Sequence, residues 1–199
     1  MPSNTLFIFA KPNRMGQAKT RLARDIGRVE AQRLNAMATS RVLRNAKSPR
    51  WHTVLMVAPD LAVWSRQPAW PNSIDRLPQG SGNLGDRMTR AFDAAPLGKV
   101  IFLGTDQPDL KKIDLLETLK ALQTHHAVFG PADDGGFWLF GMRKGISTSA
   151  PFQNVRWSTE HALADVRANL HRQSIAYLEQ RIDLDDAKAV KNWRSRTKA

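Results

Sequence analysis

The chain of 199 residues contains no cysteine. This absence excludes disulfide bonds, cysteine nucleophiles, thiolate metal sites and iron–sulfur clusters. Long hydrophobic runs are missing as well, because no stretch approaches the roughly 18 consecutive apolar residues of a membrane span. The apolar run at residues 5–10 is too short for the hydrophobic core of a signal peptide. We therefore expect a cytoplasmic protein without a membrane partner.

Negative charge is also scarce, since 18 Asp and Glu residues stand against 30 Lys and Arg residues and the net charge is +12. Such a surface attracts polyanions, so a basic nucleic-acid-binding module is one hypothesis. The basic residues are nevertheless spread from Lys11 to Lys198, and the six Trp and one Tyr form no ladder on which bases could stack. Small phosphorylated ligands would also explain local positive clusters.

Two further kinds of site find no support in the sequence. None of the five histidines has an acidic or histidine partner at a metal-ligand spacing. No G-x-S-x-G element of an α/β-hydrolase is present. A histidine metal site and a hydrolase triad are therefore not expected.

Strand-like runs alternate with helical patterns along most of the chain. This alternation predicts a single α/β domain over residues 1–199, with a basic C-terminal tail at about 194–199 and a largely parallel sheet. The expected strands are residues 5–10, 52–58, 73–77, 99–104, 126–132, 136–142 and 174–179. The expected helices are residues 29–46, 84–95, 110–124, 158–172 (with Ser158 as N-cap) and 185–193. Ligands of such sheets bind at the carboxyl ends of the strands.

The loop after the first strand, within FAKPNRMGQAKTRL, is unusually basic. Pro12 and Gly16 mark a turn. Backbone N–H groups in such a loop, together with basic side chains, can hold phosphates. It is not a Walker loop, because only one glycine is present, and a solvated basic surface loop is the alternative. The basic residues of the loop are Lys11, Arg14, Lys19 and Arg21.

A glycine-rich stretch, PQGSGNLGDRM, follows the third expected strand. Gly80, Gly82 and Gly85 match G-x-G-x-x-G, and an acid follows at Asp106, as a dinucleotide site would require. The match is nevertheless not placed after the first strand, and the strand before it is weak. A loop that lets a nucleotide base approach the backbone closely is the interpretation we favour.

Acidic residues stand at two further strand ends and near the C-terminus. Asp106 follows a buried strand and precedes a proline, which suits a hard cation such as Mg²⁺, although a turn residue is the alternative. Asp109 is a second candidate ligand of that cation, but a cap of the following helix is the role we favour for it. Asp134 lies in a turn, where it either meets acceptor hydroxyls and acts as a base or only shapes a hairpin. In IDLDDA, Asp183 and Asp185 either supply a second metal ligand or cap the last helix.

These motifs, in this order, resemble a family of bacterial glycosyltransferase-like proteins. The matching segments are FAKPNRMGQAKTRLA, PQGSGNLGDRM, LGTDQP, GPADDGGFWLFG, VRWST and IDLDDA. The resemblance as a whole extends over nearly the whole chain, from about Leu6 to Val190. Some members of that family are associated with radical-SAM or selenium-related proteins or with arsenosugar biosynthesis. The family belongs to the nucleotide-diphospho-sugar transferase superfamily. The first loop is also similar to that of phospholactate guanylyltransferases.

The resemblance implies a glycosyltransferase A-type fold, with a mostly parallel mixed sheet flanked by helices. It also implies how a nucleotide donor would be bound. Gln79 and Gly80 would lie near the base. The loop that would hold the nucleotide phosphates contains Lys11, Arg14, Gly16, Lys19 and Arg21.

The remaining roles concern the metal and the acceptor. Asp106 would bind Mg²⁺ or Mn²⁺, and Asp183 or Asp185 would complete the metal site. Asp134, with the two glycines after it, would line the acceptor side. Lys19, Asp106 and Asp134 are accordingly the candidate catalytic residues.

Two departures from the family pattern bear on the reaction. Asn83 stands where the family usually has Asp, and Asp106-Gln107-Pro108 holds only one carboxylate of the D-x-D motif that many glycosyltransferases carry. A single strand-end Asp with a distant acid favours a nucleotidyltransferase-like arrangement. With the roles that the resemblance implies, we expect a Mg²⁺-dependent transferase with a nucleotide-activated donor and a small-molecule acceptor. Glycosyl transfer is the first hypothesis, and guanylyl or uridylyl transfer from an NTP to a phosphorylated acceptor is the alternative. A homodimer is left open.

Overall fold

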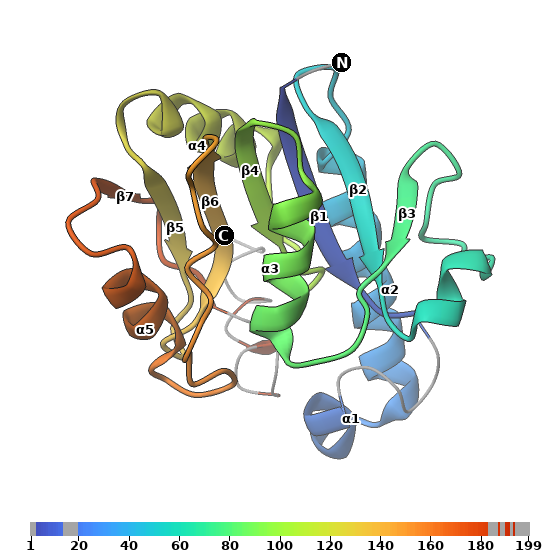
Figure 1. The fold of residues 1–199 in the computed structure, drawn as a ribbon. Coiled ribbons are helices and arrows are strands. Elements are labelled where there is room, and N and C mark those ends of the chain that lie inside the picture. The colour runs from blue at the N-terminus through green and yellow to red at the C-terminus, as the bar shows by residue number, and fades with distance from the viewer. Residues whose placement is uncertain (1–2, 14–19, 183–186, 188–189, 192, 194–199) are drawn as a thin grey trace.

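The computed structural model describes residues 3–13, 20–182, 187, 190–191 and 193 (Figure 1). Its strands are β1 (Asn4–Ala10), β2 (His52–Val57), β3 (Asp75–Pro78), β4 (Gly98–Leu103), β5 (Ala127–Pro131), β6 (Phe137–Lys144) and β7 (Ile175–Tyr177). Its helices are α1 (Thr20–Ile26), α2 (Arg28–Asn45), the 3-10 helix η1 (Asp60–Trp64), α3 (Leu84–Ala94), α4 (Lys112–Thr124) and α5 (Ala162–Asn169).

The strands form one sheet in the order β3-β2-β1-β4-β6-β5-β7. β6 runs antiparallel to β4 and β5, and the other neighbouring pairs are parallel. The antiparallel step arises because the turn after β5 is a tight hairpin, which returns the chain directly beside the strand it has left. The expected mixed, mostly parallel sheet is confirmed.

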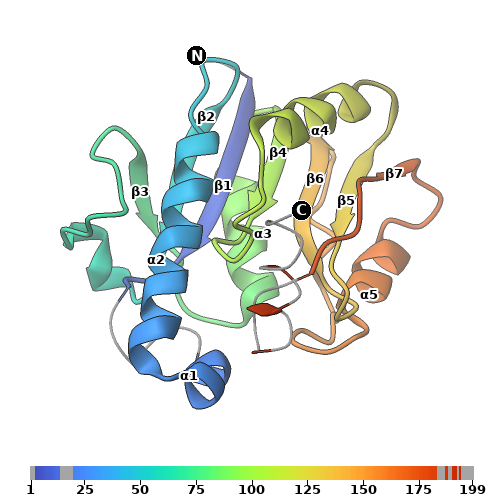
Figure 2. The same cartoon turned by 180° about the vertical axis from the view of Figure 1, so that it is seen from behind.

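Helices cover both faces of the sheet. α3 and α5 lie in front of it in Figure 1, and α2 and α4 lie in front of it in the reverse view of Figure 2. Successive side chains of a strand point to opposite faces. In β1, Leu6 and Ile8 therefore join the core under α2 and α4, whereas Phe7 joins the core under α3 and α5.

One predicted helix differs from the structure, one helix was not predicted, and one prediction lies outside the described residues. The helix expected at residues 158–172 is the shorter α5, because Ser158 has a φ of 62°, a left-handed conformation that an N-cap does not adopt. α1, which falls in the stretch predicted as a basic loop, was not expected. The helix expected at residues 185–193 and the tail at 194–199 lie wholly or largely outside the described residues.

No helix in the part of the chain that the structure describes is long and apolar enough to cross a membrane.

Candidate functional site

The loops singled out in the sequence meet at one edge of the sheet, which we call the carboxyl edge. The ends of β1, β2 and β3 are in register, with Ala10 opposite Val57 and Val57 opposite Pro78. The end of β4 lies opposite β6 close to the β5–β6 hairpin, since Leu103 pairs with Leu139. The residues that follow β1, β3, β4 and β5 therefore all emerge at this edge.

The described start of the basic loop is held from two sides. The backbone N–H of Asn13 donates to Oε1 of Gln67 at 3.2 Å. From α2, Gln32 donates to the carbonyl of Asn13 at 3.1 Å, and Asn35 donates to its side-chain oxygen at 3.0 Å. These contacts fix the path of the chain just after Lys11, whose side chain is exposed.

The rest of the basic loop is only partly described. Arg14, Gly16 and Lys19 lie outside the described residues. Arg21 lies in α1, and only its backbone is described. The next residue, Leu22, is fully buried and packs with α2, so the loop ends in an anchored helix.

Gln79 is buried and fastens the glycine-rich loop to the sheet. Its side-chain N–H donates to the carbonyls of Met56 at 2.9 Å and Ala10 at 3.4 Å. Its side-chain oxygen accepts from Nη1 of Arg87 at 3.0 Å. Both the N–H and the oxygen of the Gln79 side-chain amide thus form hydrogen bonds within the protein. Gly80 follows with a φ of 76°, which favours glycine, and its N–H donates to Oδ1 of Asp60 at 3.0 Å.

Two arginines of α3 support the same loop and were missed by the sequence analysis. Arg87 Nε donates to the carbonyl of Gly82 at 3.0 Å, and Arg90 Nη2 donates to the carbonyl of Ser81 at 2.6 Å. Among the described residues, neither guanidinium forms an ion pair with a carboxylate. Two guanidinium groups therefore lie against the glycine-rich loop. Their i, i+3 spacing at the start of a helix after a glycine-rich loop is the signal that could have identified them.

Asn83 caps the start of α3. Its side-chain oxygen accepts from the N–H of Asp86 at 3.0 Å, and the carboxylate of Asp86 accepts from the N–H of Asn83 at 2.8 Å. Asp and Asn are equally good N-caps, so asparagine at this position preserves the local structure.

The G-x-G-x-x-G match does not form a dinucleotide-binding unit. Such a unit places its glycines and its acid on neighbouring parallel strands. Here the glycines follow the edge strand β3, and β4, which leads to Asp106, is three places away in the sheet. Gly85 serves packing instead, because a Cβ there would lie 2.6 Å from Nε1 of Trp157.

Asp106 lies just beyond β4 at the carboxyl edge and is half-buried. The next residue, Gln107, is buried, and its side-chain N–H donates to the carbonyl of Ile182 at 3.4 Å. Asp109 does not cap α4 as expected, because its carboxylate accepts from the indole N–H of Trp193 at 2.8 Å. The carboxylate of Asp114 instead accepts from the backbone at the start of α4.

The segment that ends at Ile182 runs beside the hairpin and the loop of Asp106. The N–H of Arg181 donates to the carbonyl of Pro131 at 3.0 Å, and the N–H of Asp133 donates to the carbonyl of Arg181 at 3.1 Å. Asp183 and Asp185 lie outside the described residues. On the far side of that gap, the N–H of Ala187 donates to the carboxylate of Asp25 in α1 at 3.2 Å.

Asp134 shapes the β5–β6 hairpin. Its Oδ1 accepts from the N–H of Gly136 at 2.9 Å, and its side chain is exposed. Gly135 has a φ of 82° and touches the next segment, since a Cβ there would lie 2.1 Å from the carbonyl oxygen of Glu160. The turn is thus a hairpin, and the exposed carboxylate of Asp134 lies at the same edge as the loop of Asp106.

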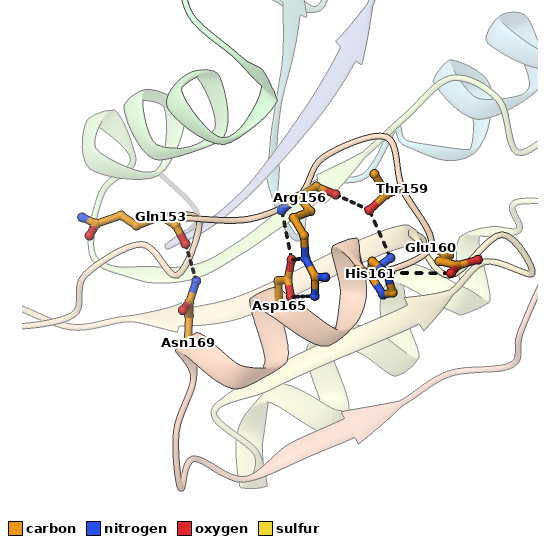
Figure 3. Close-up of polar contacts among 7 residues, drawn as sticks. All are labelled: Gln153, Arg156, Thr159, Glu160, His161, Asp165 and Asn169. Atoms are coloured by element: carbon orange, nitrogen blue, oxygen red, sulfur yellow. Dashed lines mark hydrogen bonds and ion pairs between the residues drawn. The ribbon is translucent and has the colours of Figure 1, made fainter.

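The segment between β6 and α5 is tied to α5 by a bidentate ion pair (Figure 3). Arg156 donates from Nε and Nη2 to the carboxylate of Asp165 at 2.9 and 2.7 Å, and its backbone N–H donates at 3.0 Å. The side-chain hydrogen bonds from Arg156 hold the pKa of Asp165 well below its ordinary value and raise the pKa of Arg156. This segment also carries Trp157, which packs between Phe137 and Phe152.

Comparison with known proteins gives one family and a group of similar folds. Residues 41–159 match the model of a family described as "Uncharacterized protein conserved in bacteria (DUF2064)". A search of curated proteins gives no match. A crystal structure from Desulfovibrio desulfuricans G20, described as a "putative nucleotide-diphospho-sugar transferase", is 25% identical, with a TM-score of 0.85 and coverage of 99% of this chain and 88% of that one.

More distant structures share the fold. The 4-diphosphocytidyl-2C-methyl-D-erythritol synthase of Anaerococcus prevotii DSM 20548 is 11% identical, with a TM-score of 0.57 and coverage of 98% of both chains. Rv0371C of Mycobacterium tuberculosis H37Rv, in complex with manganese, is 15% identical, with a TM-score of 0.53 and coverage of 95% of this chain and 96% of that one. The expected α/β fold, with its mixed sheet flanked by helices, is confirmed by these likenesses.

Proposed function

The chain belongs to the DUF2064 family of bacterial proteins, and we propose that it transfers a group from a nucleotide-activated donor to a small-molecule acceptor. One observation carries the proposal. The glycine-rich loop, the loop of Asp106 and the β5–β6 hairpin emerge at one edge of a sheet whose fold matches the Desulfovibrio protein. Ligands of open α/β sheets bind at this edge.

The donor would lie over β1, β2 and β3. Lys11, Arg14, Gly16, Lys19 and Arg21 would surround its phosphates. Gly80 would offer close backbone approach to the base, while Gln79 keeps the loop in place through its bonds to β1 and β2. Arg87 and Arg90 add positive charge on the helix side of the same loop, which favours an anionic ligand there.

The metal would lie at Asp106. Mg²⁺ that bridges nucleotide phosphates takes only one or two protein carboxylates, and a half-buried aspartate at a strand end fits that demand. Within the described ranges, no group of three or more His, Cys, Asp or Glu residues could hold a metal ion. We propose that Asp183 or Asp185 supplies the second carboxylate. Support comes from Ile182, the residue before Asp183, because its carbonyl contacts the neighbour of Asp106.

The chemistry would rest on positioning and electrostatics. Bound Mg²⁺ or Mn²⁺ would neutralise the phosphates and stabilise charge on the departing oxygen. Lys19 would hold the donor phosphates in line with the acceptor. Asp134, on the acceptor side, would accept the proton of the attacking hydroxyl.

Glycosyl transfer is the reaction we propose first, because the similar Desulfovibrio structure bears the description "putative nucleotide-diphospho-sugar transferase". Nucleotidyl transfer from a GTP- or UTP-like donor to a phosphorylated acceptor is the second candidate. Pro108 favours this candidate. It is buried and occupies the position of the second Asp in the D-x-D motif of many glycosyltransferases, where it offers no side-chain ligand for a metal ion. The likeness of the first loop to phospholactate guanylyltransferases points the same way.

A thermal-shift screen tests the proposal. NTPs, nucleotide sugars, NAD(P) and single-stranded DNA would each be added with and without Mg²⁺ or Mn²⁺. A metal-dependent rise in melting temperature with one NTP or nucleotide sugar is the expected result. Mass spectrometry of the products then separates the two reactions, since only nucleotidyl transfer releases pyrophosphate. A rise with DNA alone, or with NAD(P) alone, would contradict the proposal.

A further inference from the structure

A cavity of about 650 Å³ lies between α3 and the segment that joins β6 to α5, and of its lining the donor and metal assignments use only Arg90. It adjoins the glycine-rich loop, because Asn83 and Asp86 line it and Arg90, also in its lining, reaches the carbonyl of Ser81. The lining includes the polar and aromatic residues Asp86, Thr89, Arg90 and Asp93 from α3, with Gln153, Asn154 and Trp157 from the joining segment.

The wall formed by the joining segment is held in place from three directions. Arg156 is fixed to Asp165 of α5 by three hydrogen bonds, as Figure 3 shows. Asn169 donates to the carbonyl of Gln153 at 2.7 Å, and in the same figure the side-chain amide of Gln153 points away from Asn169. Trp157 lies so close to α3 that only glycine fits at position 85. The cavity is therefore a preformed feature and does not depend on a ligand to shape it.

The backbone of this wall holds two unusual conformations. Asn154, which lines the cavity, has a φ of 54°, and Ser158 has a φ of 62°. Such conformations cost free energy in residues other than glycine and collect at ligand sites. Together with the packing observations, these conformations favour a ligand-binding role for the segment.

The chemistry of the lining favours an uncharged, hydroxyl-rich ligand. Thr89, Gln153 and Asn154 offer neutral donors and acceptors, and Trp157 offers a partly exposed aromatic surface that can pack against the C–H face of a sugar ring. Two carboxylates, from Asp86 and Asp93, accompany a single guanidinium. In a chain of charge +12, this local balance disfavours a phosphate and suits hydroxyl groups, which donate to carboxylates.

We propose that this cavity binds an unphosphorylated sugar or polyol portion of the acceptor. Calling the ligand an acceptor rests on the proposed transferase function, but binding of a sugar or polyol to the cavity can be measured independently of it. Arg90 connects the two sites, because its guanidinium would lie 2.9 Å from a Cβ on Gly80 while the residue also lines the cavity. An acceptor held here would therefore lie next to the loop that we assign to the donor.

The test is ligand-observed NMR by saturation transfer, followed by calorimetric titration of any sugar that binds. The probes are unphosphorylated monosaccharides and alditols, together with the phosphate esters of the same sugars, each with and without a nucleoside diphosphate and Mn²⁺. Two variants remove exposed lining groups, Gln153→Ala and Asp93→Asn. Their matched controls, Gln123→Ala and Glu117→Gln, make the same changes at exposed positions of α4.

The expected result is binding of a neutral sugar that weakens at least tenfold in each lining variant and is unchanged in each control. Failure of every neutral sugar to bind, equal binding by the lining variants, or tighter binding of the phosphate esters would overturn the inference. Nucleotide binding is measured on the same samples. If the wild-type protein bound no nucleotide, the transferase proposal would be contradicted. If it bound a nucleotide but no sugar, only the proposal that the cavity binds a sugar would be contradicted.

Discussion

The guanidinium of Arg181 lies 2.9 Å from the carboxylate of Asp114 and stacks over the ring of Trp138 at 4.2 Å. Both charged side chains are largely buried. The pair joins α4 to the segment that runs past the β5–β6 hairpin, and Arg181 also donates to the carbonyl of Asp109 in the loop of Asp106 at 3.5 Å. It therefore braces the segment that leads to Asp183 against α4 and the loop of Asp106.

Breaking this pair is expected to destabilise the protein. Arg181→Met leaves the Asp114 carboxylate buried without its partner, and loss of one member of a buried pair costs about 3 kcal/mol. Urea denaturation measures the change in the free energy of unfolding. The double variant Arg181→Met with Asp114→Asn should recover part of the loss, because no buried charge is left over. A loss below about 1 kcal/mol would mean that the pair is solvent-screened.

Asp106→Ala is expected to abolish metal-dependent stabilisation by the nucleotide while leaving the melting temperature of the free protein nearly unchanged. The physical reason is that the proposed metal would lose its strand-end ligand. Asp109→Asn is the matched control, because it removes a carboxylate charge from the same loop and keeps an acceptor for Trp193. Equal nucleotide responses in the two variants would remove Asp106 from the metal site.

Gln79→Ala should lower stability by about 1–3 kcal/mol. The carbonyl of Met56 and the guanidinium of Arg87 would lose their hydrogen-bond partner in a buried setting. Gln79→Glu should be worse than Ala, since a carboxylate would face the carbonyl oxygens of Met56 and Ala10. Thermal melts measure both changes, with Gln123→Ala as an exposed control. Wild-type stability in Gln79→Ala would show that the amide does not fasten the loop.

Gly135→Ala should cost roughly 2–4 kcal/mol, because it combines a left-handed backbone with a methyl group 2.1 Å from the carbonyl oxygen of Glu160. Gly145→Ala is the control, since its nearest neighbour, Oγ1 of Thr148, would lie at 3.3 Å and its φ is not left-handed. Chemical denaturation of the two variants compares them. Similar stabilities would contradict the tight contact between hairpin and joining segment.

The Arg156–Asp165 pair predicts a pH dependence. The folded-state pKa of Asp165 is depressed, so its contribution to stability is present above the ordinary aspartate pKa of about 4 and is lost as pH falls further. The melting temperatures of the wild type and Asp165→Asn should therefore differ most near neutral pH and converge in acid. A difference that stays constant from pH 7 to pH 3 would contradict this assignment.

The sequence predicted the elements that depend on local pattern. The bounds of β1, β4 and α3 lie within one or two residues of the expected bounds. The reason is that apolar runs and helical spacing of apolar residues are patterns of residues that are close in the sequence. The strand ends then located the carboxyl edge by a general rule of α/β sheets. These steps required no knowledge of contacts between distant segments.

What escaped prediction depends on such contacts. The role of Gln79 follows from a carbonyl 69 residues earlier in the chain, and that of Asp109 from an indole 84 residues later. Serine favours N-caps and so predicts a cap at Ser158, but the backbone there is left-handed, in a segment that packs against Gly85 and Gly135 from other parts of the chain. The roles of Lys19, Asp134 and Asp183 stay predictions.

The direction of β6 has a consequence for how such a protein can change. A strand–helix–strand connection has a length matched to the sheet, so an insertion there disturbs a helix and its core. The β5–β6 hairpin can instead be lengthened by two residues at a time, which adds one more pair of facing residues and keeps the inward-facing side chains on their side. The two halves of the edge can therefore change separately, because the hairpin can be lengthened while the helical crossovers on the other side keep their length.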